Sequence, residues 1–176
     1  MITRIPAEFY EKAKELLEYD EINGVLTRRS STGAHKKGSV AGSSLKRDGY
    51  HRVGVSVGGV RKQVMSHKLA WFIKESEIPL FIDHKNGVRS DFRWVNLRKC
   101  TQDQNNRNRA VNSNNVTGVS GVILTRCKKK FRSQIRYQKK LITLGTFEVF
   151  EEAIKARKEA EDKYFGEFKP RNKEQK

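Results

Sequence analysis

The sequence predicts an α+β protein in two parts, each made of short antiparallel strands and short helices. Apolar residues recur at helical spacing in three stretches, 6–19, 66–76 and 148–166. Between these stretches lie alternating runs of strand length, separated by Asn-Gly or Gly-Gly turns. A polar stretch without any hydrophobic period, "RNRAVNSNNVT", then divides the chain. We therefore expect a first domain over 1–108 with its core at 66–108, a linker over 109–117, a second domain over 118–168 and a charged tail over 169–176.

The first part is expected to begin with a helix and two hairpins. In "PAEFYEKAKELLEY", the apolar spacing predicts an amphipathic helix that begins near Pro6. Asn23-Gly24 suits the turn of a first hairpin, and Gly58-Gly59 joins "GYHRVGVSV" and "VRKQVMS" in a second one. "SHKLAWFIKES" then reads as a short helix, with Ser66 available as its N-cap.

A strand-strand-helix unit completes the first part. "FIDHKNG" predicts a strand that ends at Asn86-Gly87, and "NLRKC" predicts a second strand. "TQDQNNRN" predicts the following helix, since Thr101 and Gln104 have capping-box spacing.

The second part is expected to be a small three-stranded antiparallel sheet packed on one helix. Its strands are "GVSGVIL", "KFRSQIRYQ" and "KLITLGTF", and the helix is "EVFEEAIKARKEAEDKYFG" with alanines along one side.

The charge of the chain points to a polyanionic partner. Thirty-seven Lys and Arg against twenty Asp and Glu leave a net charge of +17. From Gln104 to Phe147 there are ten Lys and Arg and no Asp or Glu, so the basic residues form a zone. Double-stranded DNA is the partner that this segregation favours, over a merely solvated basic face. We see no sign of an obligatory protein partner.

The two cysteines and the hydropathy limit the class of protein further. Cys100 and Cys127 form no CxxC pair, so we expect neither a structural zinc site nor a disulfide scaffold. No apolar run approaches membrane-spanning length and the start of the chain has no signal-peptide pattern, so we expect a cytoplasmic protein without a membrane partner.

Asp83 and His84 have the chemistry that phosphodiester hydrolysis requires. Neutral imidazole can take a proton from the attacking water. One Mg²⁺ or Mn²⁺ can stabilise the developing negative charge, and such an ion prefers carboxylate, carbonyl, phosphate and water oxygens. Asp83 could supply the carboxylate and Asn105, in the first turn of the following helix, the carbonyl. Neighbours on a regular strand face opposite sides, so Asp83 and His84 can share a site only if the strand bends there.

Two further residues have candidate roles at the same site. Asn96 could accept a hydrogen bond from the second imidazole nitrogen of His84 and so fix its tautomer. His67 could touch the site or a phosphate, or it could be a packed residue at a helix start.

The segments "DHKNG", "NLR" and "QNNRN" resemble the H-N-H nucleases of the ββα-metal class, especially phage and intron-encoded homing endonucleases. The intervals from His84 to Asn96 and from Asn96 to Asn105 match, and "SHKLAWFI", "YDEINGVLTRR" and "GYHRVGV" resemble the family's flanking segments. The resemblance implies that Asp83 and Asn105 hold the metal, that His84 is the general base and that Asn96 orients it. A non-catalytic, sequence-specific DNA-binding regulator with a vestigial H-N-H core is the alternative.

The second part carries the candidate DNA-binding residues. Phe131, Ser133 and Ile135 alternate with polar neighbours, so the sheet is expected to have one packed face and one polar face. Arginine and glutamine on the polar face can read base edges, and lysines on the turns suit phosphates. The candidates are Arg126, Lys128, Lys129, Lys130, Arg132, Gln134, Arg136, Lys139, Lys140 and Thr143.

The pattern "TGVSGV…KFRSQIRY…KLITLGTFEVFEEAIKA…FGEF" resembles the AP2 DNA-binding domain. That resemblance implies a three-stranded sheet that lies in the major groove. The arginines of the plant domains' first strand are replaced by Ile123 and Thr125, and their third-strand tryptophan by Thr143. We therefore do not expect the same site preference.

Overall fold

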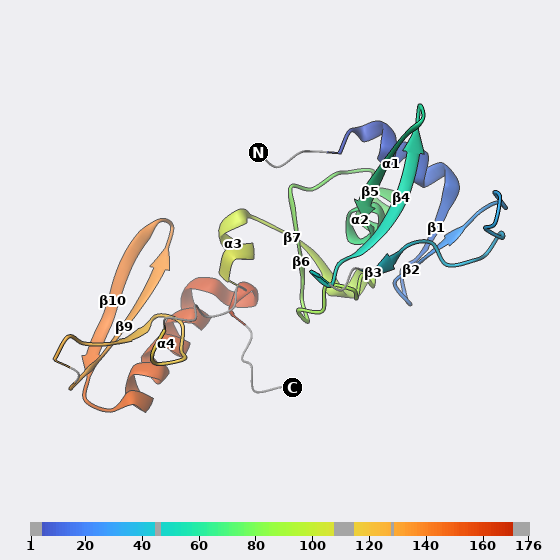
Figure 1. Ribbon diagram of the computed structural model, residues 1–176. Coiled ribbons are helices and arrows are strands. Elements are labelled where there is room, and N and C mark those ends of the chain that lie inside the picture. The colour runs from blue at the N-terminus through green and yellow to red at the C-terminus, as the bar shows by residue number, and fades with distance from the viewer. Residues whose placement is uncertain (1–4, 45–46, 108–114, 128, 171–176) are drawn as a thin grey trace. The chain divides into compact units, whose positions relative to one another are not determined.

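The computed structural model describes residues 5–44, 47–107, 115–127 and 129–170 (Figure 1). Contacts divide the chain into two compact units, Met1–Thr101 and Gln102–Lys176. The expected domain boundary after residue 108 therefore differs from this division by one helix, which packs with the second unit. Most of the expected linker and of the charged tail lies outside the described residues.

The first unit begins with helix α1 (Ala7–Leu16), which leads directly into a hairpin. Strands β1 (Leu17–Asp20) and β2 (Val25–Arg28) pair antiparallel. Gly24, with a φ of 64°, closes the turn, in the left-handed region that glycine adopts without steric cost. The Asn-Gly hairpin and the first helix thus form where the sequence predicts them.

A three-stranded antiparallel sheet and helix α2 (Ser66–Glu75) form the centre of this unit. The strand order is β3 (Ser43–Ser44), β4 (His51–Val57), β5 (Val60–Met65). Strands β4 and β5 are the predicted Gly58-Gly59 hairpin. Their inward side chains and one face of each helix meet in a core whose fully buried members are Phe9, Leu26, Val64 and Leu69.

The helix α2 begins as predicted, but Ser66 does not cap it. Met65 occupies the N-cap position, and no side chain provides a capping bond. Ser66 is the first helical residue instead, and its Oγ lies 2.7 Å from Nδ1 of His51 on β4. The hydroxyl is fully buried, so a partner on the adjacent sheet replaces a local backbone partner.

A third hairpin follows α2 and carries Asp83 and His84. Strand β6 (Phe81–His84) pairs antiparallel with β7 (Leu97–Cys100). The connection contains a 3-10 turn, η1 (Trp94–Asn96). The indole rings of Trp71 and Trp94 lie 4.8 Å apart, so this turn packs against α2.

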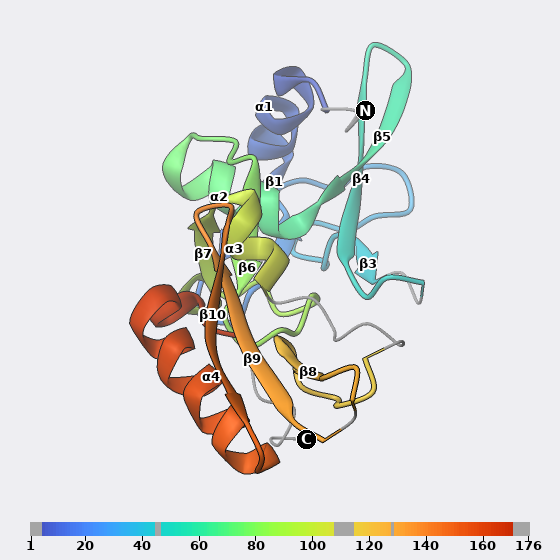
Figure 2. The ribbon, with the colours of Figure 1, turned by 90° about the vertical axis from the view of Figure 1, so that its left-hand side faces the viewer.

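The second unit contains the predicted sheet and its helix. Strands β8 (Val122–Leu124), β9 (Phe131–Tyr137) and β10 (Lys140–Phe147) form an antiparallel sheet of order β10-β9-β8. Helix α4 (Phe150–Phe165) runs along one face of β9 and β10 (Figure 2). Ser133 and Ile135 are fully buried beneath it, whereas Arg132 and Arg136 are exposed, as the alternating pattern predicts.

Helix α3 (Gln102–Arg107) is the part of the second unit that comes first in the chain. A helix of this length is marginal by itself and depends on packing. The Arg107 guanidinium supplies such a contact, 4.1 Å from the ring centre of Phe165 and 5.9 Å from that of Tyr137. The turn η2 (Gly166–Phe168) follows α4. None of the helices in the described ranges has the length and apolar character that a membrane crossing needs.

Candidate active site

Two buried imidazoles meet at the end of strand β6. His84 is the last residue of β6, and His67 lies in the first turn of α2. Their ring centres are 4.9 Å apart, in an edge-to-face arrangement with an interplanar angle of 80°. The two side chains are only 4% and 5% exposed. His67 is thus packed at the start of α2 and also contacts His84, so its role at the site stays a prediction.

Tyr50 lies against both imidazoles and was missed by the sequence analysis. Its ring centre is 5.4 Å from that of His67 and 6.1 Å from that of His84. The guanidinium groups of Arg89 and Arg52 lie over the same tyrosine ring, at 5.1 and 5.9 Å. Tyr50 thus separates two cations from the imidazole pair.

Asp48 holds those two arginines in place. Its carboxylate accepts two hydrogen bonds from Arg52, at 2.9 and 2.5 Å. Its backbone carbonyl accepts a bond of 2.9 Å from Arg89. The neighbouring arginine keeps the pKa of the Asp48 carboxyl far below its usual value, so the group stays ionised at neutral pH.

Asp83 is buried beside a cation of the opposite strand. Asp83 and Arg98 are direct partners in the β6–β7 register, so their side chains project from the same face of the hairpin. Arg98 donates to Oδ2 of Asp83 from Nε and Nη2, at 2.9 and 2.6 Å. Asp83 therefore contacts Arg98, while its neighbour His84 contacts His67.

Asn96 fixes the backbone that follows His84. Its carboxamide oxygen accepts the Asn86 N–H at 2.9 Å, and its amide nitrogen donates to Asn86 Oδ1 and to the Asp91 carbonyl at 3.0 and 2.7 Å. The Asn96 carbonyl also accepts the N–H of Lys85 at 2.8 Å. These bonds connect the side chain to the two residues directly after His84. The contact with the imidazole that the sequence suggested stays a prediction.

Burial sets the protonation of His67 and Cys100. Desolvation, with repulsion from His84 as a second cause, lowers the pKa of His67 well below its usual value, so this imidazole is neutral at pH 7. Burial and the nearby Asp83 carboxylate raise the pKa of the Cys100 thiol to about 11. Cys100 is therefore protonated at neutral pH and is not a thiolate ligand.

The predicted metal ligands are one carboxylate and one carboxamide. Asp83 lies on β6, and Asn105 lies half-buried on α3, which belongs to the second unit. Among the described residues, no group of three or more His, Cys, Asp or Glu side chains could hold a metal ion. A sparse set of oxygen donors fits Mg²⁺, which retains several waters and binds substrate phosphates.

The candidate DNA-binding residues lie on the outer face and the turns of the second unit's sheet. Thr143 pairs with Gln134 across β9 and β10, and both lie on the face away from α4. Lys128 lies outside the described residues. Lys130 forms an ion pair of 3.0 Å with Glu148. The remaining candidates have exposed side chains: Arg126, Lys129, Arg132, Arg136, Lys139 and Lys140.

Comparisons with known proteins match the segment that contains the imidazole pair. A family model described as HNH endonuclease matches residues 64–107. DNA endonuclease I-HmuI of Bacillus phage SP01 is 36% identical over 75 residues, which are 42% of this chain and 43% of that protein. The chain thus spans less than half the length of this curated relative. A solved structure described as "DNA binding and cleavage by the HNH homing endonuclease I-HmuI" aligns with a TM-score of 0.44 and 20% identity, over 83% of this chain and 82% of that one. The segment that matches the HNH endonuclease family contains the four residues that the sequence analysis assigned to the active site, Asp83, His84, Asn96 and Asn105, together with His67, whose role it left open.

Proposed function

We propose that this chain is a homing-type, metal-dependent endonuclease that hydrolyses phosphodiester bonds in double-stranded DNA. The observation that carries the proposal is the buried His84, held against a neutral His67, in a segment that matches the HNH endonuclease family. DNA is also the partner that the net charge of +17 favours.

His84 is the general base of this proposal. An imidazole with a pKa near neutrality can take the proton from a water as that water attacks phosphorus. The neutral His67 ring and the Tyr50 ring pack against His84 and so restrict the rotation of its ring. Because His67 is uncharged, it does not place a second positive charge against the base.

Asn96 is a positioning residue for His84. The sequence suggested that it acts by a hydrogen bond to the imidazole, and we retain that role as part of the proposal. Its bonds to Asn86 and Lys85 give a second way to position His84, because they hold the turn that directly follows His84. Either route keeps the proton acceptor in one orientation, which is what catalysis by proximity requires.

One Mg²⁺ or Mn²⁺ is the proposed cofactor, with Asp83 and Asn105 as the residues that would hold it. When bound, such an ion stabilises negative charge on the phosphate and the leaving 3′ oxygen. Arg98 orients the Asp83 carboxylate through its two bonds to Oδ2. A neutral carboxamide at position 105 adds no charge that would repel the DNA phosphate. The products expected from the family chemistry are a 5′-phosphate and a 3′-hydroxyl.

The second unit is proposed to anchor the enzyme on its site as an AP2-like DNA-binding domain. Support comes from the three-stranded sheet, from the helix on one of its faces and from the exposed arginines on the other. Arg132 and Gln134 are positioned to hydrogen-bond base edges, and the lysines of the turns suit phosphates. If the protein is phage-encoded, it would act in the cytosol of the bacterial host.

A plasmid-nicking assay tests the nuclease activity. Supercoiled plasmid should be nicked with Mg²⁺ and should stay intact with EDTA. His84→Ala should lose the activity, whereas His35→Ala, which replaces an exposed histidine far from the imidazole pair, should retain it. Equal nicking by His84→Ala and the parent would refute the role of His84 as the general base. Tight duplex binding without any nicking would favour the non-catalytic regulator instead.

A further inference from the structure

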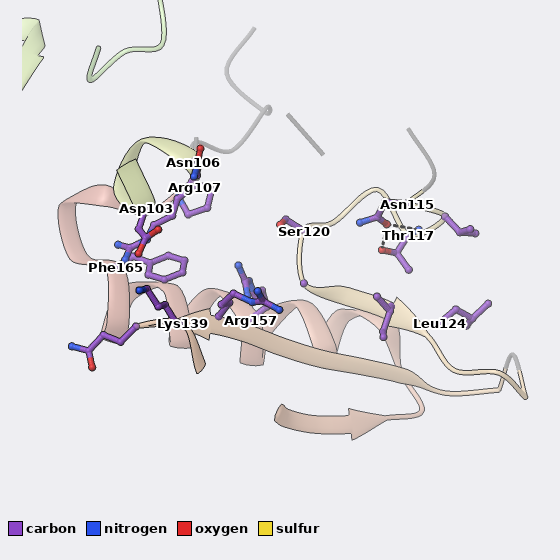
Figure 3. Close-up of a pocket in the computed structure, with 16 residues that line it drawn as sticks. Asp103, Asn106, Arg107, Asn115, Thr117, Ser120, Leu124, Lys139, Arg157 and Phe165 are labelled. Carbon is purple, nitrogen blue, oxygen red and sulfur yellow. Dashed lines mark hydrogen bonds between the residues drawn. The ribbon is translucent and has the colours of Figure 1, made fainter. Parts of the chain in front are cut away.

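The second unit contains a pocket that the proposed function does not use. Its volume is about 960 Å³, within the range of sites that hold a nucleotide-sized ligand. Figure 3 shows Arg107 of α3 and Phe165 of α4 at one end and the loop residues Asn115 and Thr117 at the other, with Arg157 between them.

One wall of the pocket is the part of strand β9 that β8 leaves uncovered. Strand β8 pairs only with the first residues of β9, up to Ser133. Just beyond, the Gln134 N–H donates to the Gly121 carbonyl at 2.8 Å, and the Gln134 carbonyl accepts from Arg157. Backbone groups alternate in direction along a strand, so the N–H of Arg136 points to the same side as that of Gln134. The backbone N–H and C=O of Arg136 therefore both face the side of β9 that β8 leaves uncovered.

The charged side chains around the pocket are mostly cationic. Four basic residues line it against one acidic residue, Asp103: Arg107, Arg136, Lys139 and Arg157. Arg157 is already paired with Glu161 at 2.8 Å. Within the described ranges, by contrast, neither Arg136 nor Lys139 has an ion pair. An anion in the pocket would offset this excess of positive charge.

The opposite wall is a loop with preset geometry. The Asn115 side-chain oxygen accepts the N–H groups of Thr117 and Gly118, at 2.9 and 3.1 Å. The Thr117 hydroxyl in turn donates to the Val122 carbonyl at 2.6 Å. These bonds hold the loop in one conformation, so the pocket does not need to order it on binding.

The pocket is continuous with the outer face of the sheet through Arg136, which favours a long anion as its ligand. Arg136 is exposed on the same face of β9 as Arg132, and it also lines the pocket. A long polyanion that lies on this face can therefore place one of its charges in the pocket. Phosphate oxygens accept from both guanidinium and ammonium groups.

We propose that this pocket seats a phosphodiester group of a DNA strand, contacted by Arg107, Arg136 and Lys139. The proposal rests on the proposed function, because the strand is part of the duplex that the enzyme binds. In this proposal Arg136 binds the sugar-phosphate backbone of the DNA and does not read a base edge.

The test measures how the full chain binds a labelled non-specific duplex at several salt concentrations, by fluorescence anisotropy. Each of Arg136→Gln and Lys139→Gln should weaken binding about tenfold at low salt. Each should also reduce the slope of log affinity against log salt by about 1, as expected when one phosphate contact is lost. Lys155→Gln removes the same charge from an exposed site on α4 that does not line the pocket. This control should leave the slope unchanged.

A calorimetric titration with inorganic pyrophosphate separates a strand from a free anion. If Lys139→Gln weakens pyrophosphate binding but leaves the salt dependence of duplex binding unchanged, the pocket takes a free anion and the proposal is wrong. It is equally wrong if the pocket variants match Lys155→Gln while the parent binds and nicks DNA. A parent protein that neither binds nor nicks DNA would instead overturn the proposed function.

Discussion

The rings of His67 and His84 pack edge to face with their centres 4.9 Å apart, and burial keeps His67 neutral. Because the pKa of His67 is lower in the folded than in the unfolded protein, the unfolded state takes up a proton first as the pH falls. The free energy of unfolding is therefore at its maximum above pH ~6.5, the pKa of histidine in the unfolded chain. Below that pH it decreases by about 1.4 kcal/mol per pH unit, until the pH reaches the pKa of His67 in the folded protein.

Denaturant unfolding between pH 8 and pH 5 measures this effect. Both tryptophans of the chain, Trp71 and Trp94, lie in the first unit, so their fluorescence follows that unit alone. A His67→Gln variant should lose much of the pH dependence, whereas His35→Gln, at an exposed position, should keep it. The same pH dependence in both variants would assign the effect to other groups.

Replacement of Asn96 should disturb the turn after His84. Asn96→Ala leaves the Asn86 N–H and the Asp91 carbonyl without their present partner in a partly buried setting. We expect a loss of about 2 kcal/mol in the unfolding free energy of the first unit, together with a marked loss of nicking. Val95→Ala removes an exposed neighbour (71% exposed) and should change neither quantity. Unchanged nicking by Asn96→Ala would remove Asn96 from the site.

The two thiols should differ in reactivity. Burial raises the pKa of Cys100 to about 11, whereas a hydrogen bond from Thr125 and backbone N–H groups lower the pKa of the exposed Cys127. Since the thiolate is the nucleophile, iodoacetamide at pH 8 should alkylate Cys127 first. Peptide mass spectrometry over time reads out both sites, and Cys127→Ser should leave only the slow reaction. Comparable rates at the two cysteines would contradict the burial of Cys100.

A methyl group at position 121 should strain the second unit. Gly121 has a φ of +79°, and an added Cβ would lie 2.5 Å from the Gln134 carbonyl oxygen and 2.6 Å from Nη1 of Arg157. Gly118 has a similar φ of +70° but nothing within 4 Å of its Cβ position. Both alanine variants bear the cost of the left-handed conformation, about 1 kcal/mol.

Only Gly121→Ala adds a clash, so its unfolding free energy should be lower by at least a further ~1 kcal/mol. Circular dichroism follows the loss of structure, while tryptophan fluorescence shows that the first unit is unaffected. If the two variants melt alike, the close packing of Arg157 under Gly121 is not rigid.

Local patterns predicted the elements of this fold well, because turn chemistry and periodicity act over a few residues. Asn23-Gly24 marked its hairpin, and the alternation around Ser133 gave the buried face of β9. Contacts between distant residues were beyond the same reasoning. Ser66 was expected to cap a helix and instead contacts His51, since burial offered it a partner on the sheet. Tyr50 reaches the imidazoles only through the fold, and no local signal marks it.

The spacing of the motif selected the candidate site residues but not the unit to which each one belongs. His84 and Asn96 lie in the first unit, and Asn105 lies in the second. This division follows from packing: Arg107 lies over Phe165, which is far along the chain. The role of each residue at the site stays a prediction.

The contact between Arg107 and Phe165 limits where such chains can recombine without a loss of packing. A recombination event that joins two relatives after residue 108 would separate the arginine from its aromatic partner, and the short helix would meet a foreign surface. A crossover at Thr101 would transfer helix and surface together. Chimaeras made at the two positions should therefore differ in the helicity of residues 102–107, and viable natural hybrids should have their junctions ahead of this helix.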